Sequence, residues 1–293
     1  MFKSWEEKLR NLRVEILGIV PDIFLKPIAE SNHVFKKILP YNFYILLNIQ
    51  DKYIGRPLLI KGSYEQWISD TFAKYLKPDS CVIDIGANIG YYSLLAASQC
   101  PNGKVFSFEP DNQNFQLLKT SIAYNGFDNI IQAYNLAVSD INKTIMIADL
   151  GNTDNSGAKV TSTNEDLLKS LVPDTDICLK KIEAVQLDTF LTDIKVDIVK
   201  IDIEGHEPYA IRGMLNIIRR DKPVIFAELA PSNIKLFSGM ETSDFLQPIL
   251  DIGYKISVVD RSSSSIEFSN DISALMNYFE QQKIHHIDIF LTA

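Results

Sequence analysis

The stretch "VIDIGANIGYYSLLAA", residues 82–97, decides the fold of this chain. The apolar letters before Gly86 are typical of a buried strand, and those after Gly90 are typical of a buried helix. Glycines in a turn between a strand and a helix let the backbone approach a ligand at the carboxyl edge of a parallel sheet. The pattern therefore favours a nucleotide-like ligand, although tight packing of the strand against the helix explains the same glycines without one.

From residue 80 onward, short apolar runs alternate with helical segments, which is typical of a parallel sheet covered by helices on both faces. Strands are expected at residues 81–86, 104–109, 130–138, 196–203, 223–229, 254–260 and 286–293. Helices are expected at residues 90–99, 112–125, 206–219 and 241–252. The predicted fold class is therefore α/β, with a seven-stranded and mostly parallel sheet between helices.

Two segments interrupt this alternation. Residues 143–187 are expected to form an inserted hairpin and loop. Within them, the polar run 151–166 has few apolar anchors and is predicted to be a mobile flap that faces the substrate. The "SSSS" stretch at residues 262–265 is expected to be an exposed turn between two late strands.

Residues 1–60 are expected to form an N-terminal helical extension to a domain that spans residues 61–293. A first amphipathic helix is predicted to end at Pro21, because apolar residues recur before it at steps of three or four: Trp5, Leu9, Leu12, Ile16 and Ile19. Charged residues interrupt this segment, so neither a signal peptide nor a transmembrane segment is expected. The apolar face of the helix is expected to pack on its own domain, with a homodimer contact or a membrane surface as the alternatives.

The composition is that of a globular protein, because 293 residues with 46% hydrophobic content can bury a large core. The formal net charge of −8 argues against a nucleic-acid partner, since phosphate binding draws its affinity from clustered lysine and arginine. Cys81, Cys100 and Cys178 show neither paired spacing nor a CxxC pattern. The three thiols are therefore expected to be reduced and the protein cytoplasmic.

Two acidic residues narrow the choice of ligand. Glu109 ends the second expected strand, where a carboxylate can accept two hydrogen bonds from a ribose diol. Asp84 precedes Gly86, and a carboxylate there suits the ammonium group of a methionine but would repel a pyrophosphate. Because the dinucleotide pattern G-x-G-x-x-G is also absent, the sequence favours S-adenosylmethionine over NAD. If Asp84 only ties down the turn by accepting backbone N–H bonds, it is compatible with either ligand.

A family resemblance rests on five stretches: "DIGANIGYYSLLAA", "FSFEPDNQNFQLLKTSIAYNG", "LAVSD", "VDIVKIDIEGHEPYAIRGM" and "PVIFAEL". Together they resemble the FkbM-type methyltransferases, a class I S-adenosylmethionine-dependent family, over roughly residues 60 to 293. The "KIDIEGHE" stretch is the most specific part. The resemblance implies a seven-stranded Rossmann-like sheet with an antiparallel last strand. It also implies O-methylation of a hydroxyl on a sugar, a glycolipid or a secondary metabolite.

The resemblance further implies a set of cofactor-binding residues: Asp84, Gly86, Ala87, Asn88, Gly90, Glu109, Pro110, Asn114, Ala137, Val138 and Asp202. Those up to Gly90 would surround the methionine part, and Glu109 would bind the ribose. Asn114 and the segment from Ala137 would lie close to the adenine. Asn88 stands where the commoner methyltransferase pattern has a glycine, which leaves open how the turn meets the methionine carboxylate.

The strand that ends in "VKIDIEGHE" carries the candidate catalytic residues. Lys200, Asp202 and Glu204 share one face of the strand, at the carboxyl end where ligands bind in this architecture. His206 follows in the turn, and its ordinary pKa of about 6.5 suits proton transfer at neutral pH. Asp202, Glu204 and His206 are therefore the candidates for the base that removes the acceptor's proton. A hydrogen bond at the start of the next helix is the alternative role for His206.

Other roles on this strand are structural, and other function classes stay open. Lys200 is expected to be a charge partner of a neighbouring acid, and Glu207 to stabilise the first turn of the next helix. A metal is not expected, although a convergence of Asp202, Glu204, His206 and Glu228 would supply oxygen and imidazole ligands. An NAD-dependent oxidoreductase and a catalytically silent cofactor-binding or scaffold protein are the alternatives to a methyltransferase. The acceptor, a small molecule or a carbohydrate, would be selected by the insertion and the N-terminal segment.

Overall fold

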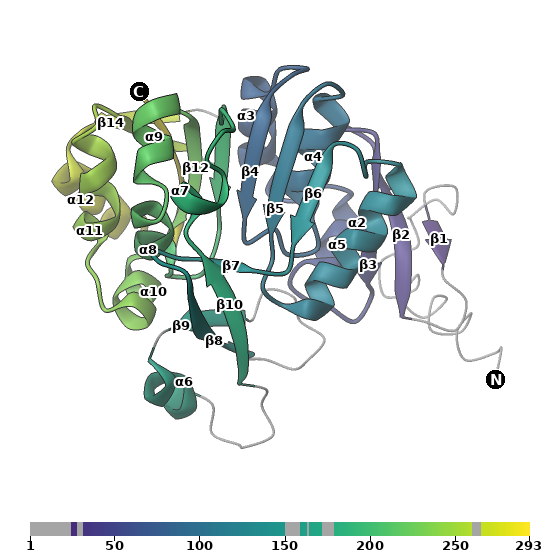
Figure 1. Cartoon of the computed structure of the whole chain (residues 1–293), viewed down its shortest axis with the longest axis horizontal. Coiled ribbons are helices and arrows are strands. Elements are labelled where there is room, and N and C mark those ends of the chain that lie inside the picture. Colours follow the sequence, from purple (N-terminus) through teal and green to yellow (C-terminus); the bar gives the residue numbers. More distant parts are fainter. Residues whose placement is uncertain (1–24, 28–31, 150–158, 163, 172–178, 260–264) are drawn as a thin grey trace.

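A computed structural model gives the fold of residues 25–27, 32–149, 159–162, 164–171, 179–259 and 265–293. Its centre is an eight-stranded sheet in the order β14-β13-β15-β12-β11-β4-β5-β6 (Figure 1). The strands are β4 (Cys81–Ile85), β5 (Lys104–Phe108), β6 (Ile131–Tyr134), β11 (Ile198–Ile201), β12 (Val224–Leu229), β13 (Lys255–Val259), β14 (Ser265–Ser269) and β15 (Ile287–Thr292).

Five neighbouring strands, β12, β11, β4, β5 and β6, run parallel. The last strand, β15, lies antiparallel between β12 and β13. This arrangement confirms the expected α/β fold with a mostly parallel sheet and an antiparallel last strand. β14 is an eighth strand that the sequence did not predict, and it pairs antiparallel with β13 at the edge. Ser265, from the stretch expected to be a turn, begins β14, and residues 260–264 lie outside the described part.

Side chains of the central strands alternate between two hydrophobic clusters, one on each face of the sheet. In β4, Val82 belongs to one cluster, and Ile83 and Ile85 belong to the other. The first cluster is completed by α3 (Gln66–Tyr75), α4 (Tyr91–Gln99) and α5 (Asn112–Asn125). The second is completed by α8 (Glu207–Arg212), α9 (Leu215–Asp221), α11 (Thr242–Leu250) and α12 (Ile272–Gln282). Both faces of the sheet are therefore covered by helices, as expected.

Two expected elements are divided in the structure. The helix expected at 206–219 is broken into α8 and α9 at Gly213, where an added Cβ would lie 2.0 Å from the backbone oxygen of Ser139. The strand expected at 130–138 is divided into β6 and β7 (Ala137–Val138), which belong to different sheets. The two breaks are close in space, because Gly213 packs against Ser139, the residue that follows β7.

The insertion forms a second sheet in the order β7-β10-β8-β9, which extends beyond the main sheet in Figure 1. β8 (Lys143–Asp149) pairs antiparallel with both β9 (Lys159–Ser162) and β10 (Lys180–Val185), and α6 (Glu165–Leu171) follows β9. The expected hairpin is therefore present. Of the expected flap, residues 151–158 and 163 lie outside the described part.

The described N-terminal segment differs from the expected helical extension. β1 (Leu25–Pro27), β2 (His33–Ile38) and β3 (Phe43–Asn48) form an antiparallel sheet. Among the described residues before residue 60, the only helical ones belong to α2 (Gly55–Lys61). The "HVFKKI" and "FYILLN" stretches are rich in β-branched and aromatic residues, which favour strands. The helix expected before Pro21 lies outside the described residues, and the boundary at residue 60 stays a prediction.

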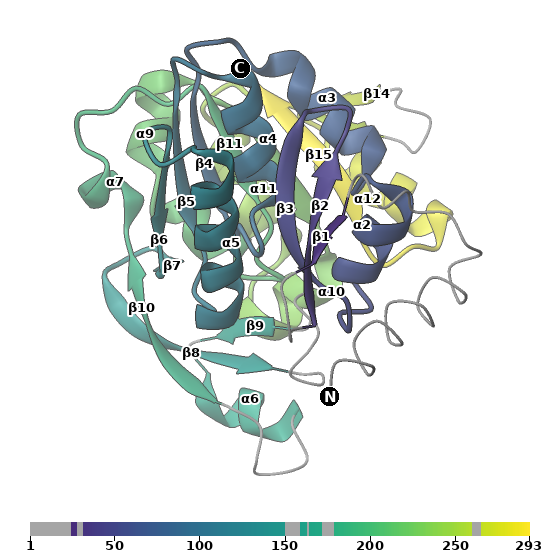
Figure 2. The ribbon, with the colours of Figure 1, turned by 90° about the vertical axis from the view of Figure 1, so that its right-hand side faces the viewer.

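This small sheet packs on the helices that follow the glycine turn. β3 contacts both α4 and α5, as Figure 2 shows. The backbone N–H of Leu46 donates a 2.9 Å hydrogen bond to Ser121 Oγ in α5, and that of Tyr44 donates one of 2.7 Å to Asn125 Oδ1. The segment is thereby attached to the domain that carries the turn.

Short helical segments complete the described chain: α7 (Leu187–Phe190), α10 (Pro231–Asn233) and the π-helix η2 (Ile234–Ser238). None of the helices in the described ranges is both long and apolar enough to cross a membrane. Cys81 and Cys100 are buried and free, as expected, and Cys178 lies outside these ranges.

Candidate active site

The turn after β4 is held by close packing of its two glycines. Gly86 has a φ of +79°, and an added Cβ would lie 1.9 Å from the backbone oxygen of Asp202. Gly90 has a φ of +97°, and an added Cβ would lie 2.4 Å from Leu118 Cδ1 in α5. A side chain at either position would clash with other atoms of the protein and would strain a backbone with positive φ. Packing therefore accounts for both glycines, and Gly86 also faces the pocket described next.

A pocket lies at the carboxyl ends of β4, β5, β11 and β12, where ligands bind in open α/β sheets. It encloses about 920 Å³, part of which is open to solvent. Of the expected cofactor-binding residues, these line it: Asp84, Gly86, Ala87, Asn88, Glu109, Pro110, Asn114 and Asp202. Gly90, Ala137 and Val138 do not line it; Gly90 caps α4, and the other two pair with β10.

Glu109 connects β5 to the turn after β4. Its Oε2 accepts a 2.7 Å hydrogen bond from the backbone N–H of Asn88, and its Oε1 accepts one of 2.8 Å from that of Asp111. Glu109 is buried but still reaches the pocket. Two backbone N–H groups thus hold the carboxylate of Glu109 at the wall of the pocket.

Asp84 is tied down from within the protein. Its Oδ2 accepts a 2.5 Å hydrogen bond from Ser93 Oγ in α4, and the Ser93 and Ser107 hydroxyls lie 2.7 Å apart. Burial raises the pKa of Asp84 to about 6, although the Ser93 hydrogen bond and the Lys200 charge oppose the rise. Asp84 therefore fastens α4 to β4 as well as lining the pocket. Both the hydroxyl and the backbone of Ser93 hydrogen-bond to Asp84, and Ser93 lies in α4 and not in the turn.

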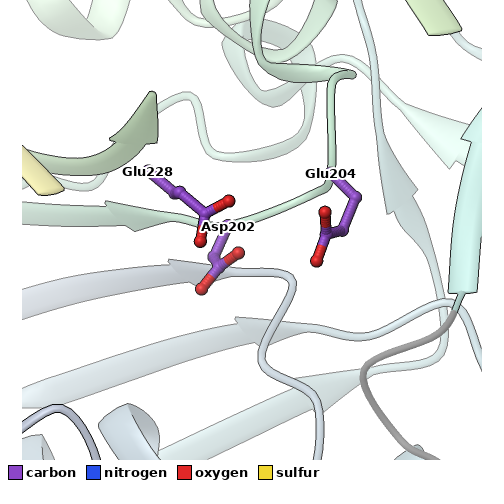
Figure 3. Close-up of side chains that lie close together, drawn as sticks. All are labelled: Asp202, Glu204 and Glu228. Carbon is purple, nitrogen blue, oxygen red and sulfur yellow. The ribbon is translucent and has the colours of Figure 1, made fainter. Parts of the chain in front are cut away.

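Three carboxylates converge on one side of the pocket, as Figure 3 shows. Asp202 and Glu204 follow β11, and Glu228 lies in β12; their nearest oxygens are all within 4.8 Å of one another. Glu204 has a φ of +53° and accepts a 3.0 Å hydrogen bond from Asn233 Nδ2. The two expected carboxylates, Asp202 and Glu204, are thus brought together, and Glu228 joins them.

Burial and mutual repulsion favour the protonated forms of two of these acids. Burial, then the charges of Asp202 and Glu207, raises the pKa of Glu204 to about 7. Burial, then the charges of Asp202 and Glu204, raises the pKa of Glu228 to about 10. Carboxyl groups this close cannot all ionise without cost. The pocket therefore combines proton donors and acceptors in a small space.

Lys200 lies beneath the three carboxylates. Its ammonium is buried, lies 3.2 Å from Asp202 Oδ2 and sits 5.0 Å from the centre of the Tyr92 ring. Burial alone would lower the pKa of Lys200, but the charge of Asp202, followed by those of Glu65 and Asp288, raises it overall. The expected role of Lys200 as a charge partner of a neighbouring acid agrees with this contact.

His206 is not brought to the pocket. It is 1% exposed, its Nε2 lies 3.2 Å from Ser139 Oγ, and its ring lies 4.7 Å from that of Tyr209. Burial lowers its pKa to about 4. The positive φ values of Glu204 and Gly205, +53° and +102°, bend the chain before His206. The histidine therefore packs against the insertion, out of contact with the carboxylates that precede it in the sequence.

The turn before α8 is held by Glu207. Its carboxylate accepts hydrogen bonds of 3.1 Å from the backbone N–H of Ile203 and 2.9 Å from that of Gly205. Burial raises its pKa to about 7, against these hydrogen bonds. Glu207 thus fixes the segment that carries Glu204, rather than acting only on its own helix.

Among the lining residues that were not singled out from the sequence, four come from segments far from the motifs. Ile54 and Tyr64 come from the segment before β4, and Ile147 and Thr161 come from β8 and β9 of the insertion. No local motif marks them, because they reach the pocket through the packing of distant segments. Tyr91, one of two tyrosines at the start of α4, lines the pocket and contacts the rings of Phe43 and Tyr64.

A model of the methyltransferase FkbM domain matches residues 84–256, which are more than half of the chain. The chain belongs to the FkbM methyltransferase family. The FkbM match includes the glycine turn, Glu109 and all three pocket carboxylates. It begins after Ile54 and Tyr64, so two residues of the pocket wall lie outside the matched FkbM range.

Individual FkbM-like relatives are distant. Methyltransferase sdnD of Sordaria araneosa is 22% identical over 195 residues, which are 59% of this chain and 72% of that protein. Methyltransferase 1 of Beauveria bassiana is 21% identical over 147 residues, which are 46% of this chain and 59% of that protein. Methyltransferase FkbM from Methylobacillus flagellatus, a solved structure, is 17% identical with a TM-score of 0.45. The match covers 73% of this chain and 44% of that one.

Proposed function

We propose that this FkbM-family methyltransferase moves a methyl group from S-adenosylmethionine to a hydroxyl of a small-molecule or carbohydrate acceptor. The observation that carries the proposal is one pocket in which the glycine turn and Glu109 face a cluster of three carboxylates. One side suits a nucleoside, and the other can take up a proton. Methyl transfer to a hydroxyl requires both.

The residues present fit the proposed cofactor. Glu109 lines the pocket at the end of β5, where a carboxylate can accept hydrogen bonds from ribose hydroxyls, and Asn114 lines the pocket as well. When bound, S-adenosylmethionine supplies a methyl group on a positively charged sulfur. Asp84 would face its ammonium group.

The protein's own part in the reaction is to place the acceptor and accept its proton. An acceptor oxygen held against the carboxylate cluster would lie within reach of Asp202 and Glu204, the candidate bases. Tyr64 and Ile54 would bound the acceptor from the N-terminal segment, and Ile147 and Thr161 from the insertion. These two walls come from segments other than the glycine turn, so we propose that they select the acceptor.

A screen with methyl-labelled S-adenosylmethionine tests the proposal. Sugars, glycolipids and polyketide alcohols are offered in parallel, and labelled product is identified by mass spectrometry. The proposal expects label on an oxygen of at least one acceptor, with loss of product in Asp202→Asn. Label found only on nitrogen or carbon would contradict O-methylation, and binding of NAD in place of S-adenosylhomocysteine would contradict the cofactor.

A further inference from the structure

Lys200 is a buried cation enclosed by acids. It lies in β11, opposite Asp84 of β4 and Phe226 of β12, and is 1% exposed. Within the described residues, it is the only lysine or arginine that lines the pocket. The ionisable groups that act on its ammonium or lie against it come from every neighbouring element: Glu65 before α3, Asp84 in β4, Tyr92 in α4, Asp202 after β11, Glu228 in β12 and Asp288 in β15.

Among these acids, Asp202 forms the direct contact. Its Oδ2 accepts the hydrogen bond from Lys200 Nζ at 3.2 Å. Three of the other acids accept hydrogen bonds from neutral donors: Asp84 from Ser93, Glu65 from the Tyr92 hydroxyl and Asp288 from Trp67 Nε1. Within the described part of the chain, Asp202 Oδ1 accepts no hydrogen bond. One oxygen of Asp202 is therefore fixed by a cation, and the other is left for a ligand in the pocket.

The two glutamates of the cluster are placed differently. Glu204 accepts its hydrogen bond from the neutral amide of Asn233, and no ion pair of the described residues includes Glu228. A direct ion pair inside a protein favours the ionised form of an acid far more than a neutral donor does. The charge of Lys200 also lowers the pKa of Glu204 and Glu228, but of these three described acids only Asp202 forms a direct ion pair with it.

We infer that Lys200 is a positioning residue for methyl transfer, which keeps Asp202 ionised and oriented so that Asp202, and not Glu204 or Glu228, receives the acceptor's proton. This inference rests on the proposed function. In the step it describes, the acceptor oxygen bonds to the methyl carbon as the carbon–sulfur bond breaks. The bonding pair remains on sulfur, and the hydroxyl proton passes to Asp202 Oδ1. Lys200 contacts neither the acceptor nor the methyl group.

A cycle of charge measurements tests the inference without an acceptor. The net charge of each folded variant is measured by capillary electrophoresis at pH 6, where an ordinary exposed aspartate is ionised. In the wild-type background, Asp202→Asn should remove most of one negative charge; loss of the Asp202 charge lowers the pKa of Glu204, whose added ionisation returns the rest. In the Lys200→Met background, it should remove less than about a third of one, because Asp202 would already hold a proton. An equal loss of charge in both backgrounds would overturn the inference.

Two further variants make the cycle specific. Lys119→Met removes an exposed lysine of α5, and Asp202→Asn should remove the same charge in that background as in wild type. Lys200→Arg retains the cation and should restore the wild-type loss, whereas a purely steric role for Lys200 would leave the arginine variant like the methionine variant. Lys200→Gln replaces Lys200→Met if the latter does not fold.

Cofactor binding separates this inference from the proposed function. If the wild-type protein fails to bind S-adenosylhomocysteine, the proposed function is contradicted, while the charge cycle still reports on Lys200 and Asp202. With an acceptor from the screen, Lys200→Met should lower kcat at unchanged KM for S-adenosylmethionine. It should also move the acid limb of the kcat profile to higher pH. An unchanged profile would overturn the positioning role.

Discussion

The Oε2 atom of Glu109 accepts a 2.7 Å hydrogen bond from the backbone N–H of Asn88, so the acid that ends β5 also holds the turn after β4. Asn88 has a φ of +53°, a conformation that side-chain-bearing residues rarely adopt. The hydrogen bond helps to keep this residue in place. The proposed contact with the ribose and the geometry of the turn therefore depend on the same carboxylate, that of Glu109.

Replacement of Glu109 should weaken cofactor binding. Glu109→Ala is expected to reduce the affinity for S-adenosylhomocysteine by roughly 2–4 kcal/mol, because charge-assisted hydrogen bonds to a buried diol are lost. Isothermal titration measures the effect. The exposed Glu280→Ala in α12 is the control and should bind like wild type. Unchanged affinity in folded Glu109→Ala would rule out the ribose role.

The glycine turn predicts a contrast between two substitutions. Gly86→Ala places a methyl group 1.9 Å from a backbone oxygen, whereas Gly126→Ala, at a φ of +70°, meets no atom within 4 Å. Both variants should lose roughly 1 kcal/mol of unfolding free energy, because alanine must adopt a left-handed backbone conformation. Only Gly86→Ala adds a clash with backbone, and it should lose at least about 3 kcal/mol more. Chemical denaturation compares them, and equal losses would refute the packing account.

The raised pKa of Glu228 predicts how stability depends on pH. Its pKa is about 10 in the folded protein against an ordinary 4.5, so the folded state binds the proton more tightly. The stability that this tighter proton binding contributes is therefore fully present below the ordinary pKa of 4.5. It is lost progressively as the pH rises from there toward 10. Glu228→Gln cannot ionise and should exceed wild type by roughly 1–3 kcal/mol at pH 8, with little difference at pH 4. Urea unfolding at both pH values checks this, and a gap that shrinks with rising pH would contradict it.

Asp202 and His206 should respond differently to substitution. Because His206 is buried against the insertion, His206→Ala should change turnover by less than about tenfold, while Asp202→Asn should lower it by roughly 10²–10⁴-fold. Both are assayed with an acceptor from the labelled screen. A loss in His206→Ala as large as that in Asp202→Asn, in a folded protein, would restore the histidine as a candidate base.

The positions of the central strands along the chain, and of Asp202 and Glu204 at the carboxyl edge of the sheet, follow from the sequence because both depend on local patterns. Buried parallel strands read as continuous apolar runs, and residues two apart share a strand face. This alternation of side chains between the two faces holds only as far as the end of the strand. At Glu204 and Gly205 the backbone takes positive φ values, so the direction of His206 could not be predicted by alternation.

Other parts of the site depend on contacts that no local pattern specifies. Tyr64 reaches the pocket because β3 packs on α4 and α5, and Thr161 reaches it through the pairing of β8 with β9. β14 was missed because its edge strand is mostly exposed and begins in serines, which are typical of turns. The hairpin of β2 and β3 had a readable signal in its β-branched and aromatic residues.

Titration of the wild-type protein with S-adenosylhomocysteine and, separately, with NAD tests the central claim most directly. We expect saturable one-site binding of S-adenosylhomocysteine, weakened by Glu109→Ala and unaffected by Glu280→Ala, with no binding of NAD. The opposite preference, or the absence of S-adenosylhomocysteine binding by folded wild-type protein, would contradict the assignment of this pocket to methyl transfer.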